Sequence, residues 1–369
     1  MAYTPEQVQE LALQHFGIRG HARPLPGEID WNYYIQAIDG QAFTLKLANP
    51  ITHRESLEMQ NALMQHLDTK GLGLDMPKVV PNIQGETITS VSGPDGQLRW
   101  MRLLTWIPGR VWAEVNPHSP ALLDTLGAML GNLSCALADF DHPAAHRFIK
   151  WDPAQAGWTK DQMNLFIDPE RRELAQYFLG LFEQKVLPIA PELRRSVTYN
   201  DANDYNILVS HDAASPKVPG VIDFGDAVFS YTVNDLAVAA AYVLMDKPDP
   251  LTAASHLVKG YCRHFALTDA ELKALFPLIG ARLLISVTCS AINLTAEPEN
   301  EYLQISDRPA WDLLRKLRDI PPALAYYTFR HAAGLEPCPK SGAFQKWAVD
   351  NYLEAYPIVG HHLQGRDVT

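Results

Sequence analysis

An aspartate and an asparagine stand five residues apart in the segment YNDANDYNILVS, positions 199–210. In a loop of this spacing, the Asp201 carboxylate can face an acceptor hydroxyl while the amide oxygen of Asn206 turns toward a metal ion. Seventeen residues beyond Asn206, Asp223 ends an apolar run in VIDFGD and precedes Phe-Gly. One carboxylate and one amide oxygen, completed by phosphate oxygens, suit Mg²⁺. Together the three residues predict a centre for phosphoryl transfer to a hydroxyl group.

Each of these signals has a plainer interpretation when it stands alone. The spacing Asp-x-x-x-x-Asn also arises in Asx-rich turns that cap a strand. The order of the two motifs and their short separation favour the functional interpretation, because a kinase catalytic loop is followed by a metal-binding Asp-Phe-Gly element in the same way.

A lysine and a glutamate upstream provide the remaining charges. Lys46 lies in FTLKLA, where the alternation puts it on the opposite face from the apolar residues, and Glu58 follows twelve residues later on a predicted helix. Phosphoryl transfer needs a cation on the nonreacting phosphates, and a helix glutamate commonly holds that cation. We therefore expect Lys46 to bind phosphates and Glu58 to pair with it, although either could be a surface charge.

The segment PGEIDWN, positions 26–32, lies between the first predicted strands and could cover phosphates with its backbone amides. Gly27 is its only glycine, so the segment does not match G-x-G-x-x-G, and a plain turn is the alternative. No G-x-x-x-x-G-K-[ST], H-E-x-x-H or G-x-S-x-G occurs in the chain. These absences leave the P-loop, zincin and serine-hydrolase motifs without support.

The elements that must position these residues begin with a capped helix at Thr4-Pro5, which Gly17 ends. Alternating runs on both sides of Asp39-Gly40 then predict a hairpin. A helix over 54–67 follows, and a second strand pair flanks the turn at 93–96. The first hundred residues thus read strand, strand, helix, strand, strand.

Helices dominate after Ile107-Pro108-Gly109, which interrupts the strand pattern and is a candidate hinge. Ser119-Pro120 and Pro169 each begin a helix, and two short β-like runs, 206–210 and 218–224, interrupt the helical patterns. We predict an N-terminal nucleotide-binding lobe, 1–107, with an antiparallel sheet, and a mostly helical catalytic and substrate-binding lobe, 108–369.

The composition is that of an ordinary globular protein of 369 residues with a formal net charge of -11 and a pI near 5.6. This charge argues against a nucleic-acid or anionic-membrane partner, and it suits a cationic substrate, although solubility alone also explains it. The four cysteines show no C-x-x-C spacing, so we expect them to be reduced. The N-terminus has no signal-peptide pattern, and apolar runs such as 236–245 are shorter than a membrane span, so we expect a cytoplasmic protein.

With these residues in hand, the sequence resembles the aminoglycoside phosphotransferase and choline kinase superfamily. Within it the likeness is greatest to hydroxylysine kinases and to kinase-like domains fused to some class III aminotransferases. The likeness covers nearly the whole chain, including LPGEIDWNYYI, FTLKLAN, YNDANDYNILV, VIDFGD and AEPENEYLQISDRPAW. It implies an α+β, protein-kinase-like two-lobed fold and the use of ATP with Mg²⁺.

The resemblance also implies roles for individual residues. Asp201 would be the catalytic base, Asn206 and Asp223 the metal ligands, and Lys46 with Glu58 the phosphate-binding pair. The hinge would hold adenine through backbone groups of Leu104, Trp106 and Ile107. Asp226 and Asp235 match acidic positions that brace the loops.

One position departs from the family pattern. The family usually has histidine two residues before the catalytic aspartate and glycine directly before it, whereas this chain has Tyr199 and Asn200. A tyrosine can pack and donate one hydrogen bond, so we expect activity to survive in a loop of altered geometry.

Two classes of function follow. The first is a kinase for an amino alcohol such as hydroxylysine, with an aminoglycoside, choline, homoserine or a sugar as alternative acceptors. The second is a nucleotide-binding regulatory pseudokinase, suggested by Tyr199 and by the segment with a single glycine. The retention of Lys46, Asp201, Asn206 and Asp223 argues against it. The residues that would recognise a substrate ammonium group are Asp204, Trp158, Glu297, Glu299 and Glu301.

Overall fold

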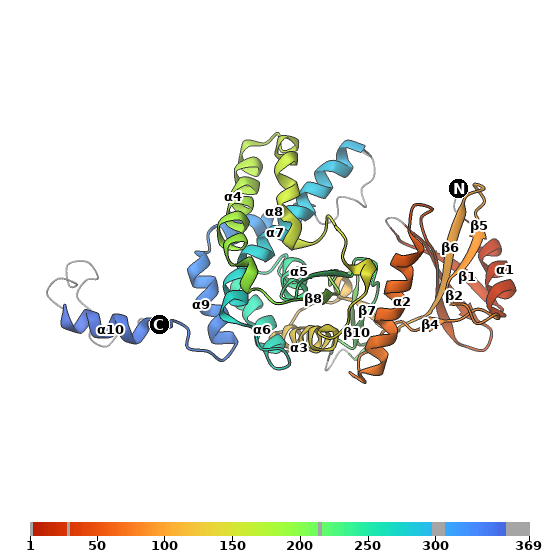
Figure 1. The fold of residues 1–369 in the computed structure, drawn as a ribbon, viewed down its shortest axis with the longest axis horizontal. Coiled ribbons are helices and arrows are strands. Elements are labelled where there is room, and N and C mark those ends of the chain that lie inside the picture. Colours follow the sequence, from red (N-terminus) through yellow and green to blue (C-terminus); the bar gives the residue numbers. More distant parts are fainter. Residues whose placement is uncertain (1–2, 28–29, 213–215, 297–306, 352–369) are drawn as a thin grey trace.

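The computed structural model describes residues 3–27, 30–212, 216–296 and 307–351 (Figure 1). An antiparallel sheet with two helices forms the N-terminal part, and helices with two small sheets form the rest. This arrangement confirms the predicted α+β class. The chain leaves the large sheet at Thr105 and joins a small one at Arg110, so the predicted boundary at 107 falls between the two, and it stays a prediction.

The N-terminal part is a six-stranded sheet with one helix on each face. Its elements are α1 (Pro5–Phe16), β1 (Gly20–Leu25), β2 (Trp31–Ala37), β3 (Ala42–Leu47), α2 (Arg54–Thr69), β4 (Val79–Val80), β5 (Thr89–Ser92) and β6 (Leu98–Thr105). The strand order is β1-β2-β3-β6-β4, and β5 pairs with β6. The predicted order of strands was incomplete, because it lacked the edge strand β1 and the two-residue β4.

Local sequence signals set the ends of α1 as expected. The Thr4 side chain accepts from the Gln7 backbone N–H, and the Gln7 side chain accepts from the Thr4 N–H. Gly17 ends the helix with φ 68°, a left-handed conformation that glycine adopts without strain. Apolar residues of α1, such as Val8 and Ala12, pack on one face of the sheet. The other face is therefore left for α2 and the active-site cleft.

The helical part has a longer list of elements. They are β7 (Arg110–Val111), η1 (Trp112–Glu114), α3 (Pro120–Leu137), η2 (Pro143–Ala145), η3 (Pro153–Leu165), α4 (Pro169–Lys185), η4 (Leu187–Glu192), β8 (Arg195–Thr198), β9 (Ile207–Val209), β10 (Gly220–Val221), β11 (Val228–Tyr231), α5 (Asn234–Val243), α6 (Pro250–Cys262), α7 (Asp269–Ala296), α8 (Asp307–Arg318), α9 (Pro322–Ala332) and α10 (Ser341–Asp350). In Figure 1, α10 extends away from the other helices. The predicted helix starts at Pro120 and Pro169 are confirmed.

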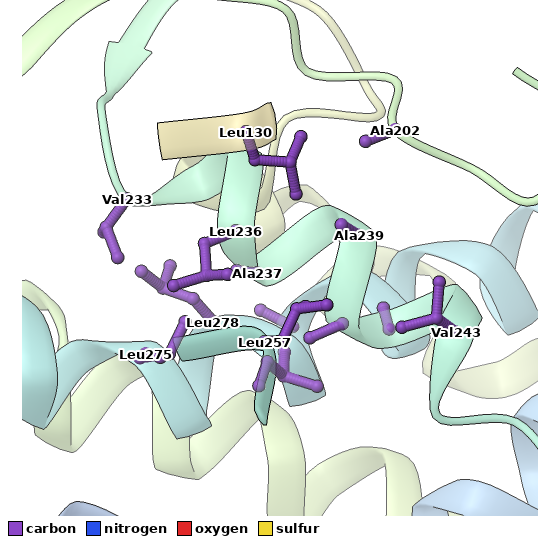
Figure 2. Close-up of a cluster of buried hydrophobic side chains, with 14 of the residues drawn as sticks. Leu130, Ala202, Val233, Leu236, Ala237, Ala239, Val243, Leu257, Leu275 and Leu278 are labelled. Carbon is purple, nitrogen blue, oxygen red and sulfur yellow. The ribbon is translucent and has the colours of Figure 1, made fainter. Parts of the chain in front are cut away.

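A buried apolar core supports the loop that carries Asp201. Figure 2 shows Ala202, from that loop, and Leu130 of α3 above α5, with Leu257 of α6 below that helix. All three residues are almost completely buried. Helices α3 and α6 cross closely because Gly127 has no side chain: a Cβ there would lie 2.0 Å from the Leu257 carbonyl oxygen. The loop thus rests on a rigid, densely packed base.

Two helices are long and apolar enough to span a membrane by length and composition alone, Pro120–Leu137 and Asp269–Thr295. The expectation that all apolar runs are too short is therefore wrong. Both helices are packed into the fold, with 61% and 89% of their apolar windows buried, as core helices of a globular domain are.

Candidate active site

The catalytic loop joins β8 to β9 and is held from below by one carboxylate. Asp235, at the start of α5, accepts the backbone N–H groups of Tyr199 (3.2 Å) and Asn200 (2.7 Å). Asn200 has φ 62°, in the left-handed region that asparagine tolerates better than most residues. This agrees with the bracing role expected for Asp235, and the turn presents the next residue, Asp201, to the cleft.

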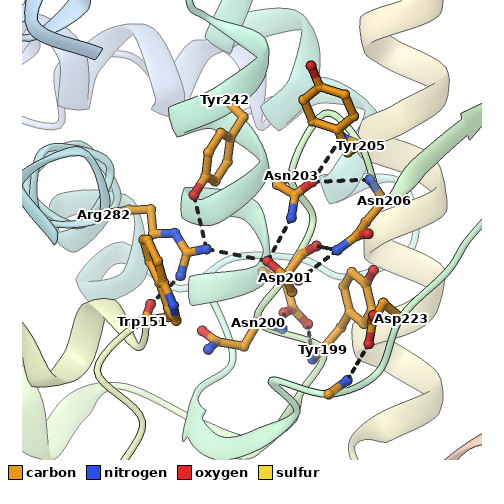
Figure 3. Close-up of polar contacts among 12 residues, drawn as sticks. Trp151, Tyr199, Asn200, Asp201, Asn203, Tyr205, Asn206, Asp223, Tyr242 and Arg282 are labelled. Atoms are coloured by element: carbon orange, nitrogen blue, oxygen red, sulfur yellow. Dashed lines mark hydrogen bonds and ion pairs between the residues drawn. The ribbon is translucent and has the colours of Figure 1, made fainter. Parts of the chain in front are cut away.

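Asp201 lies at the centre of a network of hydrogen bonds (Figure 3). Its Oδ1 accepts from Asn203 Nδ2 at 2.9 Å and lies 3.4 Å from Arg282 Nη2, while its Oδ2 accepts from Asn206 Nδ2 at 2.6 Å. The donors come from the loop itself and from α7, so both local sequence and tertiary packing orient the carboxylate. It is aimed as a general base must be.

Asn206 and Asp223 are brought together by backbone pairing. Ile222 donates its N–H to the Asn206 carbonyl at 3.0 Å, which places Asp223 next to the end of the catalytic loop. Because Asn206 Nδ2 is bound to Asp201, its Oδ1 is the atom left for a metal ion. Asp223 has φ 59°, and its Oδ1 accepts from the Gly225 N–H at 3.0 Å. An amide oxygen and a carboxylate fit Mg²⁺, which takes its other ligands from phosphates and water.

Lys46 completes the set from the N-terminal sheet. Its Nζ forms an ion pair with Asp223 Oδ2 at 2.9 Å, and its side chain is only 11% exposed. Residues 46 and 223 are joined across the cleft, so four of the predicted residues, Lys46, Asp201, Asn206 and Asp223, form one continuous site.

Tyr199 takes a defined place in the loop. Its ring is fully buried and packs edge-on against Phe224, with ring centres 5.1 Å apart. Its hydroxyl donates to the Ile222 carbonyl, directly before Asp223, the predicted metal ligand. The tyrosine therefore links the catalytic loop to the metal loop by packing and one hydrogen bond, as expected from its side chain.

Electrostatics separate the carboxylates of the site. Burial raises the pKa of Asp201 well above its usual value, and the charges of Asp226 and Asp223 add to this, while Arg282 opposes it. Burial would also raise the pKa of Asp223, but the neighbouring Lys46 outweighs it and the net pKa is lowered. Asp201 is thus the stronger base of the two, and Asp223 stays ionised, which suits its predicted role as a metal ligand.

The pKa of Asp235 lies near neutral pH in the folded protein. Burial raises its pKa from 3.8 to about 7, although the N–H groups of Asn200 and Tyr199 oppose the rise. Between pH 3.8 and about pH 7, Asp235 is therefore protonated in the folded protein and ionised in the unfolded chain. This group's contribution to stability is greatest at low pH and declines as the pH rises toward 7.

The predicted ion pair between Lys46 and Glu58 is wrong. Glu58 accepts from Arg54 Nε at 2.9 Å, one turn earlier on α2, and its side chain is 46% exposed. The residues of α2 that face the sheet are Leu57, Gln60 and Asn61, all buried. At 3.6 residues per turn, position 58 points away from that face.

The hinge offers fewer adenine contacts than expected. Leu104 lies inside the sheet, opposite Thr44 on β3, and Trp106 donates its N–H to the Ala42 carbonyl at 3.0 Å. Within the described part of the chain, no hydrogen bond engages the Trp106 carbonyl or the Ile107 N–H. These two backbone groups are therefore available to a ligand, and adenine as that ligand stays a prediction.

Gly27 is constrained by its neighbours. A Cβ at this position would lie 2.6 Å from the Asp30 carbonyl and 2.7 Å from Asn32 Nδ2. Only glycine therefore fits at this position, and its place beside the phosphates stays a prediction.

The predicted substrate residues are only partly placed. Asp204 lies in the catalytic loop, and burial raises its pKa. Trp158 donates its indole N–H to the Lys150 carbonyl at 2.8 Å, and no hydrogen bond among the described residues joins it to the catalytic loop. Glu297, Glu299 and Glu301 fall outside the described residues.

Three residues were missed by the sequence analysis: Arg282, which reaches Asp201, and the two partners of Arg282, Trp151 and Tyr242. Arg282, on α7, is buried and donates to the Trp151 carbonyl, to Tyr242 Oη (3.2 Å) and weakly to Asp201. Its guanidinium lies 4.9 Å from the Trp151 ring centre. These residues come from three distant segments, so no local motif could have identified them.

A fourth missed residue is Arg147, which follows η2. Its Nη2 donates to the carbonyls of Gly225 (2.7 Å) and Ala227 (3.1 Å), and its Nη1 lies 3.4 Å from Ser56 Oγ. The guanidinium therefore connects the loop after Asp223 to the first turn of α2.

Comparison with known proteins also indicates a phosphotransferase. The model of the phosphotransferase enzyme family matches residues 21–273. A hydroxylysine kinase from Xenopus laevis is 29% identical over 341 residues, which are 86% of this chain and 91% of the relative.

Two solved structures share the fold. A microcompartment-associated aminopropanol kinase has a TM-score of 0.65 at 19% identity, covering 90% of this chain and all of that one. An amicoumacin kinase in complex with AMP-PNP and Ca²⁺ has a TM-score of 0.63 at 18% identity, covering 85% and 94%. These likenesses confirm the protein-kinase-like fold.

Proposed function

Because the chain belongs to the phosphotransferase enzyme family, we propose that it transfers the γ-phosphoryl group of ATP, with Mg²⁺, to a hydroxyl of an amino alcohol such as hydroxylysine. The family and its named kinases make it a small-molecule phosphotransferase with an alcohol group as acceptor. The observation that carries the proposal is the continuous site of Lys46, Asp201, Asn206 and Asp223. A regulatory pseudokinase is not supported, because none of these four residues is lost or displaced.

Asp201 is the residue that would act on the hydroxyl group of the phosphate acceptor. Its carboxylate would orient the acceptor hydroxyl and accept its proton as the oxygen attacks phosphorus. A raised pKa strengthens this base, while Asn203 and Arg282 fix its direction. Charge neutralisation on the phosphates is what a bound Mg²⁺ supplies.

Residues from both lobes would bind ATP, the phosphate donor. Asp223 and Asn206 would hold the metal, and Lys46 would bind the nonreacting phosphates. The Trp106 carbonyl and the Ile107 N–H would hydrogen-bond adenine. Gly27 allows the neighbouring backbone to approach the phosphates. The AMP-PNP in the amicoumacin kinase structure supports an adenine nucleotide as donor.

The acceptor is proposed from two observations. The relative that covers 86% of this chain is named for hydroxylysine, and a solved structure of the same fold is named for aminopropanol. Both acceptors carry an amine beside a hydroxyl group, and Asp204, next to the catalytic base, is an acidic group that would attract the ammonium. The acidic net charge also favours a cation. The alternative acceptors are an aminoglycoside, choline, homoserine or a sugar.

A coupled assay of ADP release tests the proposal. The purified protein with ATP and Mg²⁺ is tested with hydroxylysine, ethanolamine, choline, homoserine and an aminoglycoside. We expect turnover with hydroxylysine above the others, lowered roughly a hundredfold in Asp201→Asn and unchanged in Glu58→Gln, whose side chain lies outside the site. Release of ADP with none of the acceptors, from protein that binds ATP, would refute the proposed transfer.

A further inference from the structure

Three polar side chains form a row across the central strands of the N-terminal sheet. Asn32 on β2 lies opposite Lys46 on β3, and Lys46 lies opposite Arg102 on β6. Directly opposed residues of antiparallel strands project from the same face. Lys46 reaches Asp223 from this face of the sheet. The Arg102 side chain therefore also projects from the face that borders the nucleotide site.

Arg102 is bound to α2 by neutral groups. Its Nη2 donates to Gln60 Oε1 at 2.6 Å, and its Nη1 donates to Asn61 Oδ1 at 2.9 Å and lies 3.5 Å from the Leu57 carbonyl. Arg102 is only 2% exposed to solvent. The described residues give it no carboxylate partner within ion-pair distance. A charge buried this deeply normally has one, because desolvation of an unpaired ion is costly.

The charge of Arg102 is nevertheless retained. Burial lowers the pKa of its guanidinium to about 10, and the charges of Asp223 and Asp30 oppose this change. It is therefore a cation at neutral pH. Its coupling to Asp223 indicates that its field reaches the metal ligand of the site.

The same contacts explain how α2 is fixed without the expected ion pair. Glu58 is turned outward and Lys46 is bound to Asp223, so no charged pair joins α2 to β3 through these two residues. Arg102 makes the connection instead, from the neighbouring strand. Because its acceptors are amides, the positive charge is not cancelled there.

We propose that Arg102 is a second cation of the phosphate site, a positioning residue that holds α2 through Gln60 and Asn61 and adds its charge to that of Lys46 for binding the polyphosphate of ATP. The inference rests on the proposed function, because it takes ATP as the nucleotide. A neutral amide at position 60 is essential to it. A carboxylate there would hold Arg102 equally well and cancel its field.

Nucleotide binding by calorimetry tests this, with ATP and Mg²⁺ as one probe and adenosine as the other. We expect Arg102→Gln to weaken ATP binding roughly ten-fold, as one unit charge at about 10 Å in a protein environment would, and to leave adenosine binding unchanged. Gln60→Glu should weaken ATP binding by a similar factor while the melting temperature stays equal or rises. Arg102→Lys should keep most of the ATP affinity.

The matched control is Arg99, on the same strand but on the other face of the sheet. It is also buried, and it pairs with Asp95 at 2.7 Å. Arg99→Gln should lower the melting temperature and leave ATP affinity unchanged. If Arg102→Gln does not fold, Gln60→Glu and Arg102→Lys carry the test, since both keep a hydrogen-bonding partner for α2.

The outcomes separate the two proposals. Wild-type ATP affinity in Gln60→Glu, or equal losses of ATP and adenosine binding in Arg102→Gln, would show that Arg102 is only a structural clasp, and the inference would be overturned. A wild-type protein that binds no ATP would instead overturn the proposed function. ATP binding that weakens selectively in Gln60→Glu supports the inference even if the phosphate acceptor proves to be another alcohol.

Discussion

The replacement of Tyr199 by phenylalanine tests how the catalytic and metal loops are joined. The change removes one buried hydroxyl and leaves the ring against Phe224. The Ile222 carbonyl then loses its side-chain donor in the interior, which costs about 2 kcal/mol of stability. For a chain of 369 residues, that loss corresponds to a melting temperature lower by about 2–3 °C.

The same substitution should slow turnover. The loop that carries Asp201 would no longer be tied to the residue before Asp223, and we expect kcat to fall about tenfold, the effect of about 1.4 kcal/mol in the barrier. The assays are a thermal melt and steady-state ADP release. Tyr33→Phe is the matched control, since Tyr33 also donates a buried hydroxyl to a carbonyl, that of Tyr3 at 2.8 Å, on the face of the sheet that packs against α1. Tyr199→Phe with an unchanged melting temperature and unchanged kcat would refute the reasoning.

Four further outcomes follow from the same structure. Asp201→Asn should bind ATP normally and lose roughly a hundredfold in kcat, and near-normal turnover would contradict its role as base. Asp223→Ala should abolish the Mg²⁺-dependent part of thermal stabilisation by ATP, so stabilisation that persists would argue against a metal ligand there. Wild-type stability should contain a component that falls from pH 4 to pH 7 by at most about 4 kcal/mol, and Asp235→Asn should remove it in pH-dependent denaturation. Gly127→Ala should lower stability by about 3 kcal/mol in urea unfolding, whereas Gly157→Ala, with open space around it, should not.

Features with a local physical cause could be predicted from the sequence. The capping box at Thr4, the hairpin at Asp39-Gly40 and the proline starts of two helices depend on neighbouring residues only, and all are confirmed. Asp201 and Asn206 were identified for the same reason, because one loop fixes their separation. The structure brings them together with Asp223 and Lys46, and their catalytic roles stay a prediction.

Features that depend on how helices face the sheet could not be predicted in this way. Glu58 was chosen by charge type, but the rotation of α2 is set by its buried side chains, and Gln60 takes the inward position. An amide gives no charge signal in a sequence, so its partner Arg102 was also missed. Arg282 meets both Asp201 and Trp151 only because the packing of α7 against η3 brings distant segments of the chain together.

The contacts of Arg147 have a consequence for the opening of the cleft. One guanidinium spans the two lobes, with short hydrogen bonds to the loop after Asp223 and a longer contact, 3.4 Å, to Ser56 on α2. If the lobes rotate apart to exchange nucleotide, the longer contact would yield first. The loop after Asp223 would then keep its hydrogen bonds to Arg147 while α2 moves, so product release would leave the lower half of the site intact.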